Sequence, residues 1–364
     1  MPLTPQRDVI TARQLTHTAL FSAISLLAGV APAVAAGAAG SAGWLAPLFG
    51  LPPVIGMAFL LQYMYRKRPD DPLDQIFYAV WGRIPGRAVL ALYAAWCTLQ
   101  ASFSLRLYIE RIQAGMFTRT GGALFAMMLL AICWWASIGR LNALTRASAV
   151  FFGLVALTLL VMLLLALPDY NLGNLLPVNP MRAQSIVLGG ASVLGPFGVL
   201  IYANFLSGRV ENRHLLGRHS LPALAVITLG CMLLFAFTIG ILGAPLTARM
   251  QDPFLIAVKN ISGTAGNARL EAFVIALWTM PTFVFISLMS MVALTLFASI
   301  GGTSGAKPMA GPLQLFIYVG ALSLGVYAAD VVRMYTSYVQ VGHYVFQYGI
   351  PVLTLGLGKL RRKI

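Results

Sequence analysis

Charged residues are scarce in this 364-residue sequence: Asp, Glu, Lys and Arg make up only 10% of it. Soluble domains carry about 25% charged residues. Hydrophobic residues account for 59%, and the mean hydropathy is +0.82. A surface that faces water cannot be built from so few charges, so most of the surface must face lipid. The scarcity of charge therefore excludes an ordinary soluble protein.

Cysteine and histidine are also sparse, with 3 and 4 copies. Cys97, Cys133 and Cys231 fall singly in different apolar stretches, without metal-binding spacing and with no implied disulfide. Neither an H-E-x-x-H motif nor a G-x-S-x-G nucleophile elbow occurs. We therefore expect no enzymatic activity, no cofactor and no metal site.

Long apolar runs are the main feature that is present. A bilayer core of about 30 Å needs roughly 20 apolar residues per helix, and a helix satisfies its own backbone polar groups in hydrocarbon. The sequence therefore predicts an all-α polytopic membrane protein with ten transmembrane helices. The ten apolar stretches are approximately 13–38, 42–65, 87–115, 120–138, 142–167, 185–206, 220–243, 269–299, 312–329 and 334–357.

The formal net charge of +15 reflects 25 basic against 10 acidic residues. When ten spans are threaded through the membrane, 17 of the 25 basic residues fall on one side. The positive-inside rule then places both termini in the cytoplasm. The basic excess is thus a topology signal with some attraction to anionic lipid head groups, and we expect no nucleic-acid partner.

The connections between the stretches are mostly short, which predicts a single membrane domain over residues 1–364. Two longer loops, 168–184 and 244–268, are expected to face outward. The second contains LTARMQDPFLIAVKNIS, an amphipathic piece suited to the membrane interface.

Residues 26–40, LLAGVAPAVAAGAAG, allow two interpretations. Arg7 and Arg13, followed by an apolar core and AVAA, fit a cleaved signal peptide, and cleavage would leave nine spans. Alternatively, the stretch spans the membrane, since it stays apolar to about residue 38. Gly29 and Pro32 would then interrupt the first membrane helix midway.

The sixth stretch contains a second candidate interruption, VLGGASVLGPFGVLIY, with Gly195, Pro196 and Gly198 near its middle. Stretches one and six each begin a set of five, and an odd number per set gives an inverted repeat. Secondary transporters hold ligands near the midplane at such paired interruptions, where half-helix N-termini favour a carboxylate. The alternative is a pair of proline kinks packed by small residues, which are common in membrane helices.

Four short motifs carry a family resemblance: ITARQL (10–15), PAVAAGAAGSAGWLAPLFG (32–50), NLLPV (174–178) and RLEAFVIALWTM (269–280). Their order resembles the spore-germination permease family, the B subunits of nutrient germinant receptors, within the amino acid–polyamine–cation superfamily. The sequence departs from a Gly-x-Gly pair that the family often has before the first-helix proline, because Ser25 and Leu27 stand at those positions.

The resemblance implies a leucine-transporter-type fold of five plus five inverted helices, with repeats at about 10–167 and 185–358. It implies a sensor in the inner spore membrane that recognises a small germinant, often an amino acid. The implied partners are an A-type membrane subunit and a C-type lipoprotein. An active amino-acid or polyamine transporter, and a passive channel or scaffold subunit, remain alternatives.

The candidate ligand-binding residues cluster at the two interruptions, with a hydroxyl from Ser192, an apolar wall from Phe197 and a cavity-facing Tyr93. Arg106 and Glu110 stand at i,i+4 spacing, as an ion pair or as an outer gate. Arg269 and Glu271 begin the eighth stretch, where Glu complements the helix dipole or both residues serve the outer vestibule. The full ligand set is Gly29, Pro32, Tyr93, Ser192, Gly195, Pro196, Phe197 and Gly198.

Overall fold

The computed structural model describes residues 8–115, 121–176, 183–261, 268–303, 305–324 and 334–364, and these are almost entirely helical. The elements in the first half are β1 (Ile10–Thr11), α1 (Ala12–Leu27), α2 (Ala31–Ala39), the 3₁₀ helix η1 (Gly40–Leu45), α3 (Ala46–Lys67), α4 (Leu73–Trp81), α5 (Arg83–Gly115), α6 (Gly122–Ile138), α7 (Leu141–Leu165), and the 3₁₀ helices η2 (Leu167–Asp169) and η3 (Leu172–Leu175). The second half has α8 (Ala183–Phe197), α9 (Val199–Ala203), η5 (Asn204–Arg209), β2 (Val210–Glu211), η6 (Arg213–Leu215), α10 (Leu216–Leu242), α11 (Ala244–Thr247), α12 (Pro253–Lys259), α13 (Ala268–Gly301), η8 (Lys307–Met309), α14 (Ala310–Ser323), the π-helix η9 (Tyr335–Val339), α16 (Gln340–His343), the π-helix η10 (Tyr344–Gly349) and α17 (Ile350–Leu360).

Each of the ten apolar stretches contains helix in its described part. Six helical segments are long and apolar enough to cross a membrane, and a shorter apolar helix covers Gly122–Ile138. The multi-pass helical architecture is therefore confirmed, whereas the count of ten spans and the inverted repeat remain predictions. The six segments are Ala31–Lys67, Arg83–Ala114, Leu141–Leu165, Gln184–Arg209, Arg213–Leu242 and Ala272–Gly301.

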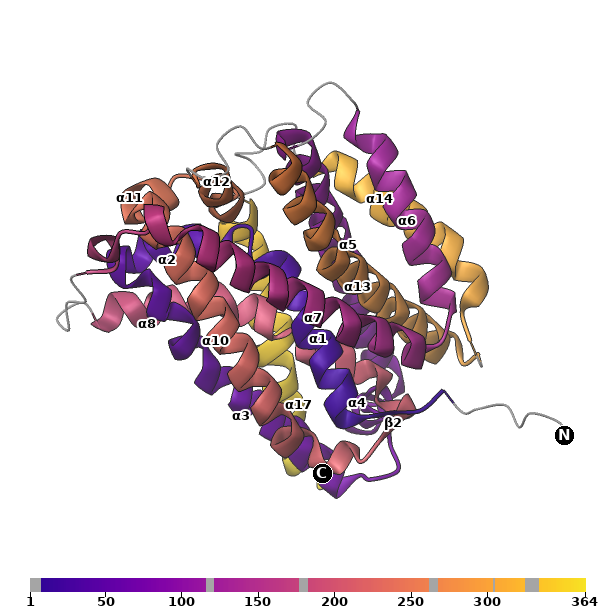
Figure 1. Cartoon of the computed structure of the whole chain (residues 1–364). Helices are drawn as coiled ribbons and strands as arrows, with labels where there is room; N and C mark the ends of the chain where they lie inside the picture. Colours follow the sequence, from indigo (N-terminus) through magenta and orange to yellow (C-terminus); the bar gives the residue numbers. More distant parts are fainter. Residues whose placement is uncertain (1–7, 116–120, 177–182, 262–267, 304, 325–333) are drawn as a thin grey trace, which may run out of the picture.

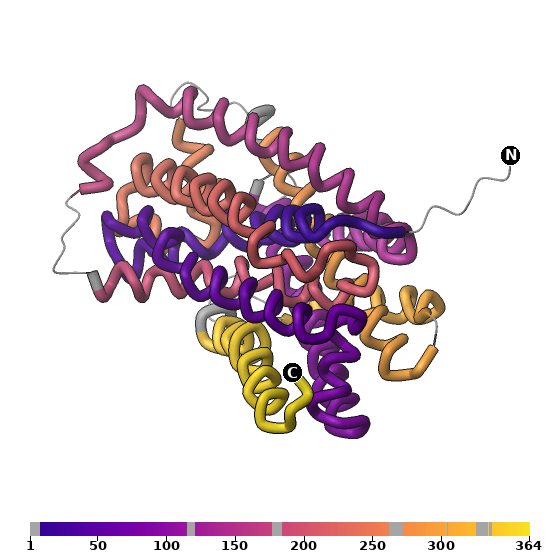
Figure 2. Tube along the Cα trace, turned by 90° about the horizontal axis from the view of Figure 1, so that it is seen from below, coloured from indigo at the N-terminus to yellow at the C-terminus, as the bar shows by residue number. Residues whose placement is uncertain are grey.

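The long helices α5 and α13 pack along each other and carry α6 and α14 on their outer side (Figure 1). A second group is formed by α3, α8 and α10, and α1 connects the groups by packing on both α10 and α13. Figure 2 shows the C-terminal helices, in yellow, beside α3 and α4. The C-terminus, α4 and β2 lie at the opposite end of the molecule from α11 and α12 (Figure 1).

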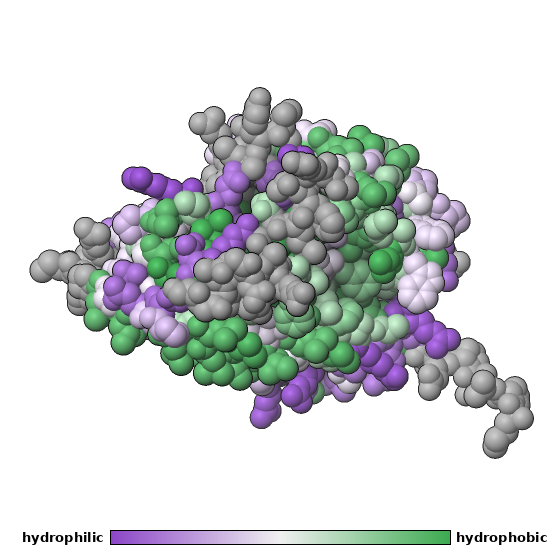
Figure 3. Space-filling model, turned by 45° about the horizontal axis from the view of Figure 1, so that its top comes forward, coloured by the Kyte–Doolittle hydropathy of each residue, from purple (hydrophilic) through white to green (hydrophobic). Residues whose placement is uncertain are grey.

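The outward faces of the helices are apolar. On α7, Leu157 is 58% exposed, Leu160 54% and Leu164 58%. Figure 3 shows broad hydrophobic surfaces, with hydrophilic residues gathered mainly at the upper left and the lower right. Such a belt is unfavourable in water and favourable in lipid, which agrees with a membrane protein.

The two interrupted helices are joined at one end by a short parallel β-ladder. Ile10 in β1 is in register with Val210 in β2, and Thr11 is in register with Glu211. The strand β1 leads directly into α1, and β2 follows the segment α8–α9–η5. The ladder therefore fixes the start of the first helix relative to the end of the sixth.

The first interruption occupies residues 28–30, between α1 and α2. Pro32 lies in the first turn of α2, where a missing N–H is tolerated. Its ring would clash with the carbonyl of Ala28 if the helix continued, so α1 ends at Leu27. The second interruption is shorter, because only Gly198 separates α8 from α9, and its N–H still donates to the carbonyl of Leu194 at 3.0 Å.

Candidate functional site

A cavity of about 380 Å³ lies beside the first interruption. It lies within the usual range for small-molecule sites. Its walls come from the α1–α2 interruption, the C-terminal end of α5, and the segment that leads into and through α12. The lining residues are Gly29, Leu107, Glu110, Arg111, Ala114, Arg249, Met250, Gln251, Asp252, Leu255, Ile256 and Lys259.

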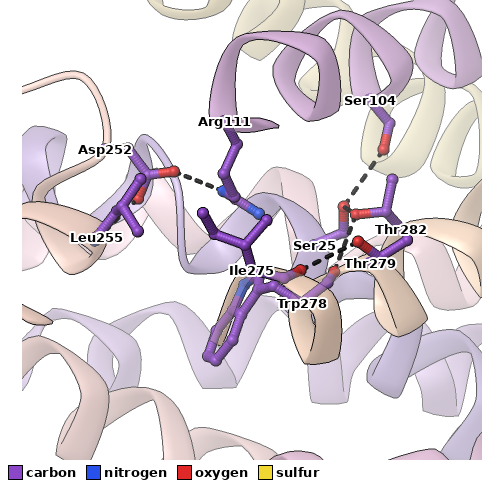
Figure 4. Close-up of polar contacts among 9 residues, drawn as sticks. All are labelled: Ser25, Ser104, Arg111, Asp252, Leu255, Ile275, Trp278, Thr279 and Thr282. Carbon is purple, nitrogen blue, oxygen red and sulfur yellow. Dashed lines mark hydrogen bonds and ion pairs between the residues drawn. The ribbon is translucent and has the colours of Figure 1, made fainter. Parts of the chain in front are cut away.

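Arg111 and Asp252 form an ion pair in the cavity wall. The Arg111 Nε donates to the Asp252 Oδ2 at 2.6 Å, and the Arg111 side chain is only 7% exposed. Asp252 also caps α12, because its Oδ1 accepts from the Leu255 N–H at 3.2 Å. Figure 4 shows Arg111 reaching from α5 between Asp252 and Ile275, with Trp278 below Ile275.

Hydroxyl groups form a second polar cluster near the end of α1. The Ser25 Oγ lies 2.9 Å from the Thr282 Oγ1 of α13 and 3.3 Å from the Ser104 Oγ of α5 (Figure 4). All three side chains are buried. The cluster joins the last turn of α1 to α5 and α13. It therefore fixes the end of α1, directly before the interruption, against the two long helices.

Arg106 and Glu110 are paired as their spacing predicts, with the Arg106 Nε 3.0 Å from the Glu110 Oε1. Only Glu110 lines the cavity. The predicted ion pair therefore lies at the border of the cavity, and a gating role stays a prediction.

The second interruption faces the C-terminal helices. The Gln347 Nε2 donates to the Gly195 carbonyl at 2.7 Å, and the Tyr348 hydroxyl donates to the Leu194 carbonyl at 3.0 Å. A Cβ on Gly198 would collide with the Gln347 side chain. Two carbonyls just before this interruption, those of Leu194 and Gly195, are thus bonded by side chains of η10.

The remaining candidates do not line the Gly29 cavity, and all of them except Pro32 lie in the core around the second interruption. Tyr93 is fully buried and donates to the Phe346 carbonyl at 2.7 Å, and Phe197 is fully buried. Ser192 is 2% exposed, and its hydroxyl has no hydrogen-bond partner among the described residues. Pro196 is buried within α8, and Pro32 is buried within α2.

Arg269 and Glu271 lie in the first turn of α13, and their side chains are outside the described residues. The predicted interfacial piece is partly helical as α12, but its apolar residues Phe254, Leu255 and Val258 are buried against the protein. The helix α12 packs its apolar side against α10 and α13, so this side does not face lipid.

Two residues of the cavity wall, Arg111 and Asp252, were not expected from the sequence to have a functional role. Arg111 carried a usable signal, since an arginine inside an apolar stretch needs a partner or a cavity. Asp252 also carried a local signal. It is an N-cap residue followed by a proline, Pro253, at the first helical position, and this pair marks the beginning of α12. Their pairing across 141 residues had no local signal.

Comparison with solved structures defines the class. The fold matches that of Mhp1, a nucleobase-cation-symport-1 family transporter solved in a closed conformation with bromovinylhydantoin bound, with a TM-score of 0.65 and 13% identity. The match covers 99% of this chain and 82% of that one. The chain is therefore a multi-pass membrane protein with a transporter fold.

The sequence comparisons assign the family. The chain belongs to the spore germination protein family, whose sequence model matches residues 11–322. It is also similar to spore germination protein KB of Bacillus subtilis (strain 168), with 22% identity over 292 residues, or 78% of this chain and 75% of that protein. Membership of the amino acid–polyamine–cation superfamily is consistent with both findings.

Proposed function

We propose that the chain is a nutrient-sensing subunit of a spore germination receptor, built on ten membrane spans in two inverted sets of five. The observation that carries this proposal is the cavity of about 380 Å³ at the interruption between α1 and α2. The cavity is lined by the interruption between α1 and α2, by the long helix α5 and by the short helix α12. Filling it can favour one arrangement of these three elements over another.

The ligand we propose is a small amino acid, with Gly29 giving it access to the interrupted backbone. A ligand shifts a conformational equilibrium only by its differential affinity for the two states. An A-type membrane subunit and a C-type lipoprotein would detect that shift in the inner spore membrane. We propose that both termini are cytoplasmic: the charge bias of the loops gives the side, and the C-terminus and β1 lying at one end, opposite α11 and α12, support a shared side (Figure 1).

Ligand-induced thermal shift of the purified protein tests the proposal. The panel contains the L-amino acids, common nucleosides and simple sugars, and Gly29→Val is measured beside wild type. We expect at least one compound to raise the melting temperature of wild type and to have no effect on Gly29→Val. The control is Gly56→Val, since nothing lies within 4 Å of a Cβ at Gly56. A shift that survives in Gly29→Val contradicts the proposed site.

Active transport is the second candidate function, favoured by the transporter fold shared with Mhp1. Uptake of a labelled form of the stabilising compound into proteoliposomes separates the two. A sensor binds the compound with little turnover, whereas a transporter accumulates it. If no compound in the panel binds saturably, a passive channel or scaffold subunit becomes the better interpretation.

A further inference from the structure

The charge pattern of the Gly29 cavity selects for the chemistry of its ligand. Three basic residues line it against two acidic ones. One of the acidic residues, Glu110, is already paired with Arg106. With Arg111 paired to Asp252 and Glu110 paired to Arg106, the exposed Arg249 leaves the lining with a positive excess, which opposes a cationic ligand such as a polyamine and favours a ligand with a negative group. The basic residues are Arg111, Arg249 and Lys259, and the acidic residues are Glu110 and Asp252.

Arg111 has unused hydrogen-bonding capacity in this cavity. Its guanidinium carries five N–H donors, and only Nε bonds a described residue, the Asp252 carboxylate at 2.6 Å. The side chain is more than nine-tenths buried, and its unbonded Nη groups keep their access to solvent through the cavity that Arg111 lines. A negatively charged partner in the cavity would use these donors in charge-assisted hydrogen bonds.

The unused donors point to the helix interruption. A Cβ built on Gly29 would lie 3.2 Å from the Arg111 Nη2, and its next neighbour, the carbonyl of Leu26, is 3.9 Å away. The absence of a side chain at position 29 therefore lets the guanidinium lie close to the interrupted backbone, and both residues line the same cavity. The helix α2 starts two residues later without a side-chain cap, which adds a favourable dipole for a negative group.

We propose that Arg111 anchors the carboxylate of the ligand through its two Nη groups, and that Asp252 holds the guanidinium in the absence of that ligand. This rests on the sensor function proposed above, and it names the group by which the ligand is recognised. Two carboxylates on one guanidinium repel each other, so a bound ligand weakens the hold on Asp252. Because Asp252 caps α12, ligand binding loosens the start of α12.

The proposal assigns opposite roles to the two partners, and substitution can separate them. Asp252→Asn removes the competing charge and keeps a good N-cap residue. Arg111→Gln removes the anchor but leaves the half-buried Asp252 without its counter-charge, which can destabilise the fold. The double variant Arg111→Gln/Asp252→Asn removes both charges and replaces the ion pair by two amides. Arg218→Gln is the matched control, since it removes an exposed arginine that does not line the cavity.

The probe is an equimolar mixture of tritiated L-amino acids, with binding measured on the purified full-length protein. The competitor is the mixture of the corresponding α-carboxamides, which lack the carboxylate. We expect Asp252→Asn to bind about fivefold or more tightly, the double variant to lose binding by about tenfold or more, and Arg218→Gln to change by less than about threefold. The carboxamides should compete poorly with wild type.

Three results overturn this inference: unchanged or weaker binding by Asp252→Asn, near-normal binding by the double variant, or equal competition by the carboxamides. Failure of wild type and Asp252→Asn to bind any of the mixture also overturns it. The sensor proposal is judged separately, because a neutral nucleoside or sugar that stabilises wild type but not Gly29→Val would keep that proposal and remove this one.

Discussion

Gln347 donates a hydrogen bond from its Nε2 to the main-chain carbonyl of Gly195 at 2.7 Å. The two residues are 152 positions apart, and the bond joins the π-helix η10 to the last turn of α8. The same side chain also bonds the His343 Nδ1 at 3.0 Å. The carbonyls of Gly195 and of its neighbour Leu194 are therefore already bonded by side chains of η10, whereas the first interruption borders a cavity. The two interrupted helices of the proposed repeat thus differ in what they can offer a ligand.

Replacing Gln347 with Leu should destabilise the protein without changing its ligand specificity. The substitution leaves the buried Gly195 carbonyl without its donor, and an unsatisfied buried group costs about 1–3 kcal/mol. We expect a lower melting temperature in detergent. Tyr338→Phe serves as the control. Because Tyr338 is 73% exposed, this variant should have the melting temperature of wild type. Equal melting of Gln347→Leu and wild type would show that the contact contributes little.

Gly29→Ala and Gly195→Ala should have different effects. A Cβ on Gly195 would lie 2.6 Å from the His343 Cδ2, and a buried ring cannot easily move, so Gly195→Ala should cost about 1–3 kcal/mol of stability. A Cβ on Gly29 meets the end of the Arg111 side chain, which can shift, so Gly29→Ala should melt near wild type. Melting curves with and without ligand separate loss of stability from loss of binding. Similar melting of the two variants would contradict this assignment.

Sequence reasoning located the helix interruptions because their cause is local. Pro32 blocks the helix that precedes it, and Pro196 with Gly198 weakens α8 at its end, whatever packs around them. The long apolar runs also located helices in the described part of every predicted stretch, since a helix that spans lipid needs about 20 apolar residues wherever it lies in the sequence. A feature with a local cause can be recognised within one segment of the sequence, which is why the interruptions and the helices could be predicted.

The contacts that distinguish the two interruptions have no local cause. The π-helical segments Tyr335–Val339 and Tyr344–Gly349 read simply as apolar helix, because a change of hydrogen-bond register depends on packing. Likewise, Arg111 is visible as an arginine in an apolar run, but its partner in a distant loop is not. The position of the cavity follows from such long-range pairs, which one sequence without homologues does not reveal.

The crossing of α3 and α8 should tolerate no side chain at Gly50. A Cβ there would collide with Val193 and would lie 2.9 Å from the Gly190 carbonyl. Small residues allow membrane helices to approach closely, so Gly50→Ala should separate α3 from α8 and lower the melting temperature. Gly56→Ala on the same helix is the control, because nothing lies within 4 Å of its Cβ and alanine favours the helix. The prediction fails if Gly50→Ala and Gly56→Ala have the same melting temperature.

The Ser25–Thr282 hydrogen bond should give a measurable coupling between α1 and α13. Hydrogen bonds between membrane helices contribute about 0.6 kcal/mol on average, so Ser25→Ala and Thr282→Val should be non-additive by roughly that amount. The matched cycle pairs Ser25→Ala with Thr279→Val, because the Thr279 hydroxyl bonds the Ile275 carbonyl of its own helix at 3.0 Å. Detergent-induced unfolding in mixed micelles supplies the four free energies of each cycle. Coupling confined to the Thr282 cycle identifies the contact that fixes the end of α1 beside the cavity, whereas equal coupling in both cycles would assign the effect to α13 as a whole.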